Sequence, residues 1–209
     1  MRILPDVLVE EIFALKGGTA INFFFRDLPR LSVDIDLTYL PLTDRSTALQ
    51  DIHDALRRIT DRIKRRLPGV KITPRVSKET SLYIGLIVMS YDATVKIEPN
   101  TIMRGAAYPV QLRPLARRAE ELFEFHIEAR TLSLADLYGG KICATLDRQH
   151  PRDLYDIHLL FRAEGITDEV RKAFIVYLVC QPRPILEVLD PSMTDIRDAF
   201  DKEFQGMVL

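Results

Sequence analysis

The chain has 209 residues, a formal net charge of −1, and 47% hydrophobic against 28% charged residues, which is ordinary for a soluble globular protein with a substantial core. No apolar run approaches the ~20 residues that cross a bilayer, and the first residues are acidic where those of a signal peptide would be basic. Membrane association is therefore not expected, and the expected location is the cytoplasm. Cys143 and Cys180 lie outside any metal-ligand spacing and are expected to be free thiols.

In chain order, the hydrophobic patterns predict a mixed α/β half and then a helical half. The first half is expected to contain a short helix from residue 7 into a strand at 13–17, a short helix at 19–26, a strand at 32–40, a helix at 46–67, and a meander of strands at 70–76, 81–91, 93–100 and 106–112. Further helices are expected at 115–125, 133–148, 151–165, 167–180 and 192–204. We therefore predict an α+β fold with two domains, a core at 1–113 and a C-terminal helical domain at 114–209.

A glycine pair precedes the first short apolar helix. Gly17 and Gly18 would let backbone N–H groups approach an anion closely, and Thr19 adds a hydroxyl group at the same place. Arg26 and Arg30 follow as candidate phosphate-binding residues. This signal is weak by itself, because paired glycines more often form an ordinary turn.

The predicted strand at 32–40 carries two acids on one face. Asp34 and Asp36 are two residues apart, so both side chains are expected to point away from the apolar face of the strand. Two carboxylates on one face can hold Mg²⁺ and leave positions for phosphate and water, although two exposed acids on a solvent-facing strand are also common. If the strand at 93–100 pairs beside this one, its Glu98 joins them, and three converging carboxylates require cations to offset their repulsion.

A later block, GGKICATLDRQHPRDLYD, supplies further charged candidates. Lys141 follows a second glycine pair inside an otherwise good helix, which lowers helix stability without an evident structural return. A lone helical lysine is usually a surface residue, but this one is a phosphate-binding candidate. Asp153 and Asp156 lie on roughly the same side of the next helix, so either could face a site or hold a neighbouring arginine. Asp156 is the favoured site residue because it lies deeper in the apolar run.

The charge of the chain is unevenly distributed. Residues 57–78 hold nine basic residues and a single acid, Asp61. The plain interpretation is a solvated helix face whose basic residues lie near the C-terminal end, where the helix dipole favours them. The alternative is a surface that binds the phosphate backbone of a nucleic acid. On that alternative, the RNA-contacting residues would be Arg57, Arg58, Arg62, Lys64, Arg65 and Arg66.

Together these features resemble the nucleotidyltransferase superfamily of DNA polymerase β type. More closely, KGGTAINFF, RLSVDIDL, VKIEPN and GGKICATLDRQHPRDLYDIHLL are similar to the AbiEii family, the nucleotidyltransferase-like toxins of type IV toxin–antitoxin systems, to which the MenT-type toxins are related. The resemblance runs from about Phe13 to about Phe161 and continues more weakly through the C-terminal helices. Fifteen residues separate Gly18 from Asp34, which is longer than the usual spacing in the superfamily.

The resemblance implies a polymerase-β-type core with a mixed, twisted sheet and a C-terminal α-helical bundle. It also implies a bacterial enzyme that uses two Mg²⁺ ions to transfer a nucleoside monophosphate from a nucleoside triphosphate to an acceptor. RNA (tRNA) is the expected acceptor, with a protein as the alternative acceptor, and a cognate antitoxin protein is the implied partner. The resemblance implies that Gly17, Gly18, Thr19 and Lys141 bind the nucleotide. Arg30, the phosphate-binding candidate named above, completes this set. The implied metal ligands are Asp34, Asp36 and Glu98, and the implied catalytic set is Asp34, Asp36, Glu98, Lys141 and Asp156.

Two other interpretations stay open. A small-molecule nucleotidyltransferase, of the kind that adenylylates aminoglycosides, would share the metal site. An acidic pocket in the helical half would favour that acceptor class, whereas a basic groove would favour RNA. A non-catalytic member would bind nucleotide or antitoxin without turnover, but the intact glycine pair and the full set of acids and Lys141 favour catalysis.

Overall fold

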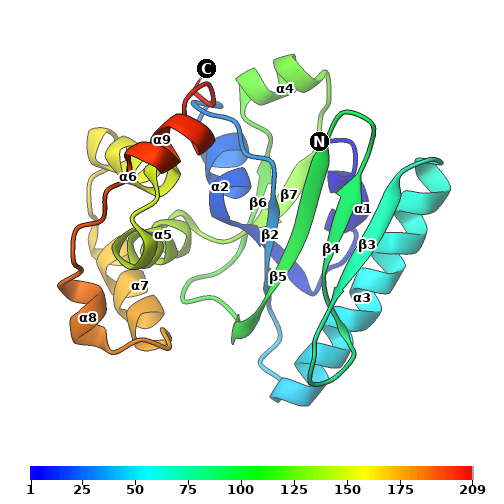
Figure 1. Ribbon diagram of the computed structural model, residues 1–209, viewed down its shortest axis with the longest axis horizontal. Helices are drawn as coiled ribbons and strands as arrows, with labels where there is room; N and C mark the ends of the chain where they lie inside the picture. The colour runs from blue at the N-terminus through cyan, green and yellow to red at the C-terminus, as the bar shows by residue number, and fades with distance from the viewer. Residues whose placement is uncertain (209) are drawn as a thin grey trace.

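The computed structural model describes residues 1–208 and contains a seven-stranded mixed sheet with the strand order β3-β4-β5-β2-β1-β7-β6 (Figure 1). The strands are β1 (Phe13–Lys16), β2 (Ile35–Tyr39), β3 (Lys71–Val76), β4 (Tyr83–Met89), β5 (Thr94–Arg104), β6 (Gln111–Pro114) and β7 (Glu128–Thr131). The helices are α1 (Leu4–Leu8), α2 (Gly17–Ala20), α3 (Arg45–Arg66), α4 (Arg117–Phe123), α5 (Leu134–Arg148), α6 (Pro151–Arg162), α7 (Asp168–Val179), α8 (Ile185–Leu189) and α9 (Arg197–Glu203), and a π-helical turn, η1 (Ile21–Phe25), continues α2. Among residues 1–208, no helix has both the length and the apolarity to span a membrane.

Helices lie on both sides of this sheet. Helix α3 packs on β4 and β5, with α1 beside it. Helices α5 to α9 gather on the other side, next to α2 (Figure 1). Cys143 and Cys180, in and just after these helices, are free thiols, as predicted.

The meander β3-β4-β5 is confirmed, but the prediction that residues 106–112 extend it is wrong. The end of that segment forms β6 at the opposite edge of the sheet, antiparallel to β7. Strand β5 has no free edge for it, because β5 already lies between β4 and β2. Strand β7 was not predicted, since its four residues are too few to show an alternation. The sheet thus continues past residue 113, where the sequence suggested a domain boundary, and the division into two domains stays a prediction.

Helix α3 is formed by a capped start and a continuous apolar stripe. The Asp44 carboxylate accepts hydrogen bonds from the backbone N–H groups of Ser46 (2.9 Å) and Thr47 (3.0 Å), two of the donors that a helix start leaves unpaired. The buried residues of the helix are Ala48, Leu49, Ile52, Ala55, Leu56, Ile59 and Ile63. Each fully buried Leu or Ile of this stripe contributes ~1.5–3 kcal/mol to folding, so α3 is firmly held on one face of the sheet.

Strand β2 shows the predicted alternation. Ile35 and Leu37 are buried on the α3 side of the sheet. Tyr39 lies on the same face, where its hydroxyl donates to Asp51 of α3 (2.5 Å). Because strand side chains alternate between faces, Asp36 projects from the opposite face. The apolar residues of the strand therefore decide which side of the sheet receives the acid.

The glycine pair inside α5 has a packing role that the sequence did not reveal. A Cβ on Gly139 would lie 2.7 Å from the backbone N of Phe174 in α7, and one on Gly140 would lie 3.2 Å from the ring of Tyr177. Real Cβ atoms do not approach a backbone that closely, so glycine permits the close contact of α5 with α7. This corrects the view that the pair lowers helix stability without a structural return.

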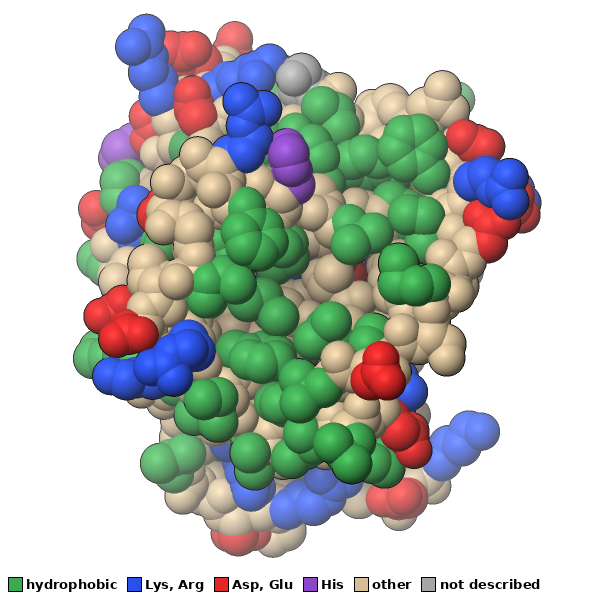
Figure 2. Space-filling view, turned by 90° about the vertical axis from the view of Figure 1, so that its left-hand side faces the viewer, with side chains coloured by type: hydrophobic (Ala, Val, Ile, Leu, Met, Phe, Trp, Pro, Cys, Tyr) green, Lys and Arg blue, Asp and Glu red, His purple; other side chains and the backbone are tan. Residues whose placement is uncertain are grey.

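The helical half has an apolar outer surface. Figure 2 shows this side of the molecule, with hydrophobic side chains over much of its middle. The exposed hydrophobic residues of α7 and α8 are Ile175, Val176, Val179, Ile185, Leu186 and Leu189. The helices therefore bury apolar residues between α5 and α7 and leave others exposed on the outside.

Candidate active site

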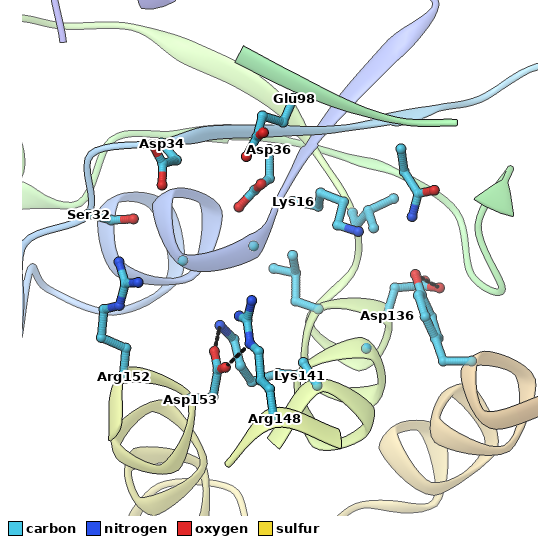
Figure 3. Close-up of a pocket in the computed structure, with 18 of the residues that line it drawn as sticks. Lys16, Ser32, Asp34, Asp36, Glu98, Asp136, Lys141, Arg148, Arg152 and Asp153 are labelled. Atoms are coloured by element: carbon cyan, nitrogen blue, oxygen red, sulfur yellow. Dashed lines mark hydrogen bonds and ion pairs between the residues drawn. The ribbon is translucent and has the colours of Figure 1, made fainter. Parts of the chain in front are cut away.

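A cavity of about 380 Å³ lies between the face of the sheet that carries Asp36 and the helices α5 and α6. The charged residues that line it are Lys16, Arg30, Asp34, Asp36, Glu98, Asp136, Lys141, Asp147, Arg148, Arg152 and Asp153, together with Gly17 and Gly18. In Figure 3 the acids of the sheet side face the lysine and arginines of the helices across this space. The cavity is therefore charged on both walls. The sheet side contributes three acids and Lys16, and the helices α5 and α6 contribute three cations and three acids.

The two predicted aspartates meet in this cavity. Strand β2 begins at Ile35, so Asp34 lies just before the strand and Asp36 within it. Among residues 1–208, neither carboxylate has a hydrogen bond or ion pair with another side chain or backbone group. Burial raises the pKa of Asp36, and the positive charge of Lys16 opposes this rise. A pair of carboxylates without partners is a suitable ligand set for a hard cation such as Mg²⁺.

The glycine pair leaves room for side chains of the site. Gly17 has φ +70°, and a Cβ there would lie 2.2 Å from Oδ2 of Asp36. A Cβ on Gly18 would lie 2.9 Å from both Nη2 of Arg30 and Oγ of Ser32. Both glycines line the cavity, and Gly17 in particular allows the Asp36 carboxylate to lie against the backbone. Their binding of nucleotide stays a prediction.

Thr19, predicted to contact a triphosphate, does not line the cavity. Its side chain is buried, and its hydroxyl donates to the backbone carbonyl of Asp34 and shares a hydrogen bond with Ser32. The reason is that α2 directs this side chain toward the loop at 32–34. Thr19 therefore positions Asp34 from behind.

Glu98 lies where the sequence interpretation placed it but is engaged in an ion pair. Strand β5 pairs with β2 in parallel, and Glu98 stands directly opposite Asp36. The side chain of Arg75 crosses from β3 over Gly85, which has no side chain, and forms an ion pair with Glu98. In the described part of the chain, no three acids, histidines or cysteines lie close enough together to hold a metal ion. The role of Glu98 as a third metal ligand therefore stays a prediction.

The opposite wall is organised around two buried aspartates. The Asp153 carboxylate accepts from Nζ of Lys141 (2.8 Å) and Nε of Arg148 (2.6 Å). Asp156 is fully buried, accepts two hydrogen bonds from Arg30 (2.8 and 2.6 Å), and lies 3.2 Å from Nζ of Lys141. Three cations thus fix two carboxylates in one network.

The network corrects the choice of Asp156 as the acid that faces the site. Asp153 lines the cavity, whereas Asp156 lies behind it and acts through Arg30 and Lys141. The two residues share one side of α6, as expected. Because Asp156 lies deeper among the apolar residues of the helix, it is farther from the cavity than Asp153. Arg26 is not part of the cavity either, because it pairs with Glu164 on the protein surface.

Lys16 is a site residue that the sequence interpretation missed. It stands opposite Asp36 in the antiparallel β1–β2 pair and lines the cavity. Burial lowers its pKa, the nearby charge of Asp36 opposes this, and no residue of 1–208 forms an ion pair with its amino group. A lysine that ends a buried apolar strand directly before a glycine pair was the available signal.

The predicted RNA-contacting residues lie away from the cavity. They belong to α3, on the other face of the sheet. Arg58 and Arg62 form ion pairs with Glu10, and Arg66 does so with Asp6. The structure therefore does not bring this basic helix to the candidate site, and half of its predicted contacts are occupied within the chain.

The ion pair of Lys141 with Asp153 is expected to make the stability of the fold depend on pH. Burial alone would raise the pKa of Asp153, but Lys141 and Arg148 lower it to about 2. A carboxyl group with a lowered folded-state pKa stabilises the fold above its unfolded pKa, and this contribution is lost as the pH falls toward 2. We expect Asp153→Asn to lower the free energy of unfolding by about 2 kcal/mol at pH 7, and the difference from wild type to shrink between pH 4 and pH 2. Urea denaturation at several pH values measures this.

The exposed ion pair of Asp198 with Lys202 offers the control. The Asp198 side chain is 90% exposed, so Asp198→Asn should change stability little at any pH. A pH-independent difference between wild type and Asp153→Asn would contradict the assignment.

Comparisons with known proteins concern the family and the fold of this chain. The family model of the nucleotidyl transferase AbiEii toxin of type IV toxin–antitoxin systems matches residues 1–208. No curated protein matches the chain. Among solved structures, MenT4, a nucleotidyltransferase toxin of Mycobacterium tuberculosis, has a TM-score of 0.65 at 15% identity, covering 92% of this chain and 71% of that one. JHP933 of Helicobacter pylori has a TM-score of 0.49 at 18% identity, covering 90% of this chain and 83% of that one.

The likeness to MenT4 shows the fold and confirms the predicted nucleotidyltransferase architecture. The family match spans all of the described residues. The chain therefore belongs to the AbiEii family of nucleotidyltransferase toxins.

Proposed function

We propose that this chain is a Mg²⁺-dependent nucleotidyltransferase that transfers a nucleoside monophosphate from a nucleoside triphosphate to a hydroxyl group of RNA, with tRNA as the expected acceptor class. The observation that carries the proposal is that Asp34 and Asp36, whose carboxylates have no partner among residues 1–208, face basic side chains of α5 and α6 across one cavity (Figure 3). A triphosphate with its metal ions requires both walls, oxygen ligands on one side and cations on the other.

Asp34 and Asp36 are the residues that would hold the metal ions. Their oxygen atoms are hard ligands, both line the cavity, and Gly17 leaves space beside Asp36. Mg²⁺ in this position supplies charge neutralisation of the triphosphate and orientation of the reacting oxygens. Glu98 stands opposite Asp36 in the paired strands β2 and β5 and lines the same cavity, so we assign it the role of accepting the proton of the acceptor hydroxyl.

In the proposed reaction, the acceptor oxygen forms a bond to the α-phosphorus. The bond between the α-phosphorus and the oxygen that bridges to the β-phosphate breaks, and pyrophosphate leaves. The hydroxyl proton passes to Glu98. Lys141 and Arg152 on one wall, and Lys16 on the other, stabilise the negative charge that accumulates on the departing pyrophosphate. The work of the protein is positioning and charge stabilisation.

An RNA acceptor is favoured over an antibiotic-like small molecule because the exposed charged residues beside Glu98 on β3 and β5 are basic. Since the family consists of toxins of type IV toxin–antitoxin systems, we propose a cognate antitoxin as the cellular partner of this chain.

Incorporation of labelled nucleotide tests the proposal. Purified protein is incubated with Mg²⁺, each of the four labelled nucleoside triphosphates, and total bacterial RNA with cell-extract protein. We expect label in a tRNA-sized band with wild type and none with Asp34→Ala/Asp36→Ala, because the double variant lacks both proposed metal ligands. Label on a protein band, or label that is unchanged in the double variant, would contradict the proposal. A folded wild type that binds Mg²⁺-nucleotide but labels nothing would favour the binding-only alternative.

Gly17→Ala tests whether the glycine is required for the site. The added Cβ would meet Asp36 Oδ2 at 2.2 Å, so we expect at least a tenfold loss of affinity for the Mg²⁺-bound nucleoside triphosphate by titration calorimetry. Gly165→Ala is a matched control, since Gly165 has φ +72° and no atom within 4 Å of an added Cβ. Both variants should lose ~1–2 kcal/mol of stability from the left-handed backbone. Equal nucleotide binding by the two variants would contradict the prediction.

Lys16→Met tests the residue that the sequence interpretation missed. Removing a positive charge from the wall of the cavity should weaken binding of the same Mg²⁺-bound nucleotide at least tenfold, because the triphosphate loses a partly buried cationic partner. Lys64→Met, at an exposed lysine of α3, should bind the nucleotide like wild type. If Lys16→Met also binds like wild type, Lys16 does not contact the nucleotide.

A further inference from the structure

A second cavity adjoins the first and shares part of its lining. Its volume is about 290 Å³, and it shares Lys16, Asp36, Glu98 and Asn100 with the candidate active site. Arg75 lines this second cavity and not the first. The proposed reaction needs two entrances, one for the nucleotide and one for the acceptor, and the acids shared by the two cavities lie between them.

The second cavity is lined by Arg75 and by residues 98–102 of β5, and Arg75 belongs to an exposed face of the sheet. Helix α3 packs on β4 and β5 from one side, burying Leu86, Val88 and Ile97. The residues that alternate with these project from the opposite face of the sheet. On that face Lys71, Thr73 and Arg75 of β3, and Thr94 and Lys96 of β5, are exposed. The sheet between the site and its β3 edge is therefore open to a ligand.

The register places these side chains on the same face as the site. Arg75, Gly85 and Glu98 form one row across the three strands, in line with Asp36 of β2. Lys96 precedes Glu98 by two residues, so it lies about 7 Å farther along the same face.

Lys71 precedes Arg75 by four residues, about 13 Å along β3. Cations thus continue from the acidic row to the far end of the sheet.

The charge of this face is nearly all of one sign. Among the residues of β3, β4 and β5, Glu98 is the one acid, against the basic residues Lys71, Arg75, Lys96 and Arg104. Lys71 and Lys96 are exposed, and neither forms an ion pair within residues 1–208. The β4–β5 hairpin at the Lys71 end also carries Tyr91, whose side chain is fully exposed. Exposed cations with a free aromatic ring suit a nucleic-acid strand, since phosphates take the charges and a base can stack on the ring.

We propose that the acceptor RNA lies along the open face of β3-β4-β5, with its phosphates on Lys71 and Lys96 and its reacting end in the second cavity at Glu98. This inference rests on the proposed function, because it names the path of the acceptor to the same site. A small-molecule acceptor in the second cavity would not reach Lys71. Because Lys71 and Lys96 extend away from the cavity along the sheet, they favour an acceptor that is a polymer. It also replaces α3 as the RNA-contacting surface.

Charge reversal on the two surfaces separates the alternatives. Binding of 5′-labelled, unfractionated bacterial tRNA is measured without nucleotide at several salt concentrations for wild type, Lys71→Glu/Lys96→Glu, and the matched α3 variant Arg57→Glu/Lys64→Glu. We expect the sheet variant to bind tRNA at least tenfold more weakly, with a salt slope flatter by about 1.5 to 2, as two lost phosphate contacts require. The α3 variant should stay within about twofold of wild type.

Two further readouts separate the acceptor path from the reaction. The sheet variant should bind the Mg²⁺-bound nucleotide like wild type and should label tRNA less only at limiting tRNA. Wild-type-like tRNA binding by the sheet variant, or an equal loss in the α3 variant, would overturn the inference and leave the proposed function intact. Wild type that binds tRNA at Lys71 and Lys96 but incorporates no nucleotide would overturn the proposed function and not the docking surface. If the reversed variant does not fold, Lys71→Gln/Lys96→Gln is measured in its place.

Discussion

Lys16, Asp36 and Glu98 stand opposite one another across three central strands because the registers of β1 with β2 and of β2 with β5 are fixed. The apolar residues on the reverse face, such as Ile35 and Leu37, specify these registers. A slip of one residue would bring them out of the core and turn the charged groups inward. The site therefore depends on hydrophobic burial against α3, although no residue of α3 lines the cavity.

Two kinds of carboxylate line or adjoin the cavity, and they have opposite roles. Asp153 and Asp156 are held by Lys141, Arg148 and Arg30, and their charge is satisfied within the protein. Such networks add little net stability, because burying the charges offsets their attraction, but they hold Lys141 in one position at the wall of the cavity. Among residues 1–208 Asp36 has no such partner, and partial burial raises its pKa. Asp153 and Asp156 therefore have a structural role, whereas the carboxylate of Asp36 is available to bind a cation from solution.

Much of this arrangement follows from local sequence patterns. The period-two alternation in β2 predicts the shared face of Asp34 and Asp36, and the glycine pair predicts a close backbone approach, which the structure shows to be an approach to Asp36. The parallel pairing of β2 with β5 was a condition in the sequence argument and is observed. Lys16 was missed because its importance comes only from the strand opposite it. The position of β6 at the far edge was missed because it depends on which strand edges are already paired. A local sequence pattern does not contain that information.

The basic residues show the same distinction between local pattern and three-dimensional context. The densest run of positive charge lies on α3, but Glu10 and Asp6 neutralise part of it while they hold α1 against α3. The sparser lysines of β3 and β5 have no acidic partner on their strands apart from Glu98, which Arg75 already binds. Phosphate binding depends on charge that is free and near the reacting groups, and a count along the sequence measures neither property. By this criterion the open face of the sheet, with fewer cations than α3, fits the proposed RNA acceptor better than α3 does.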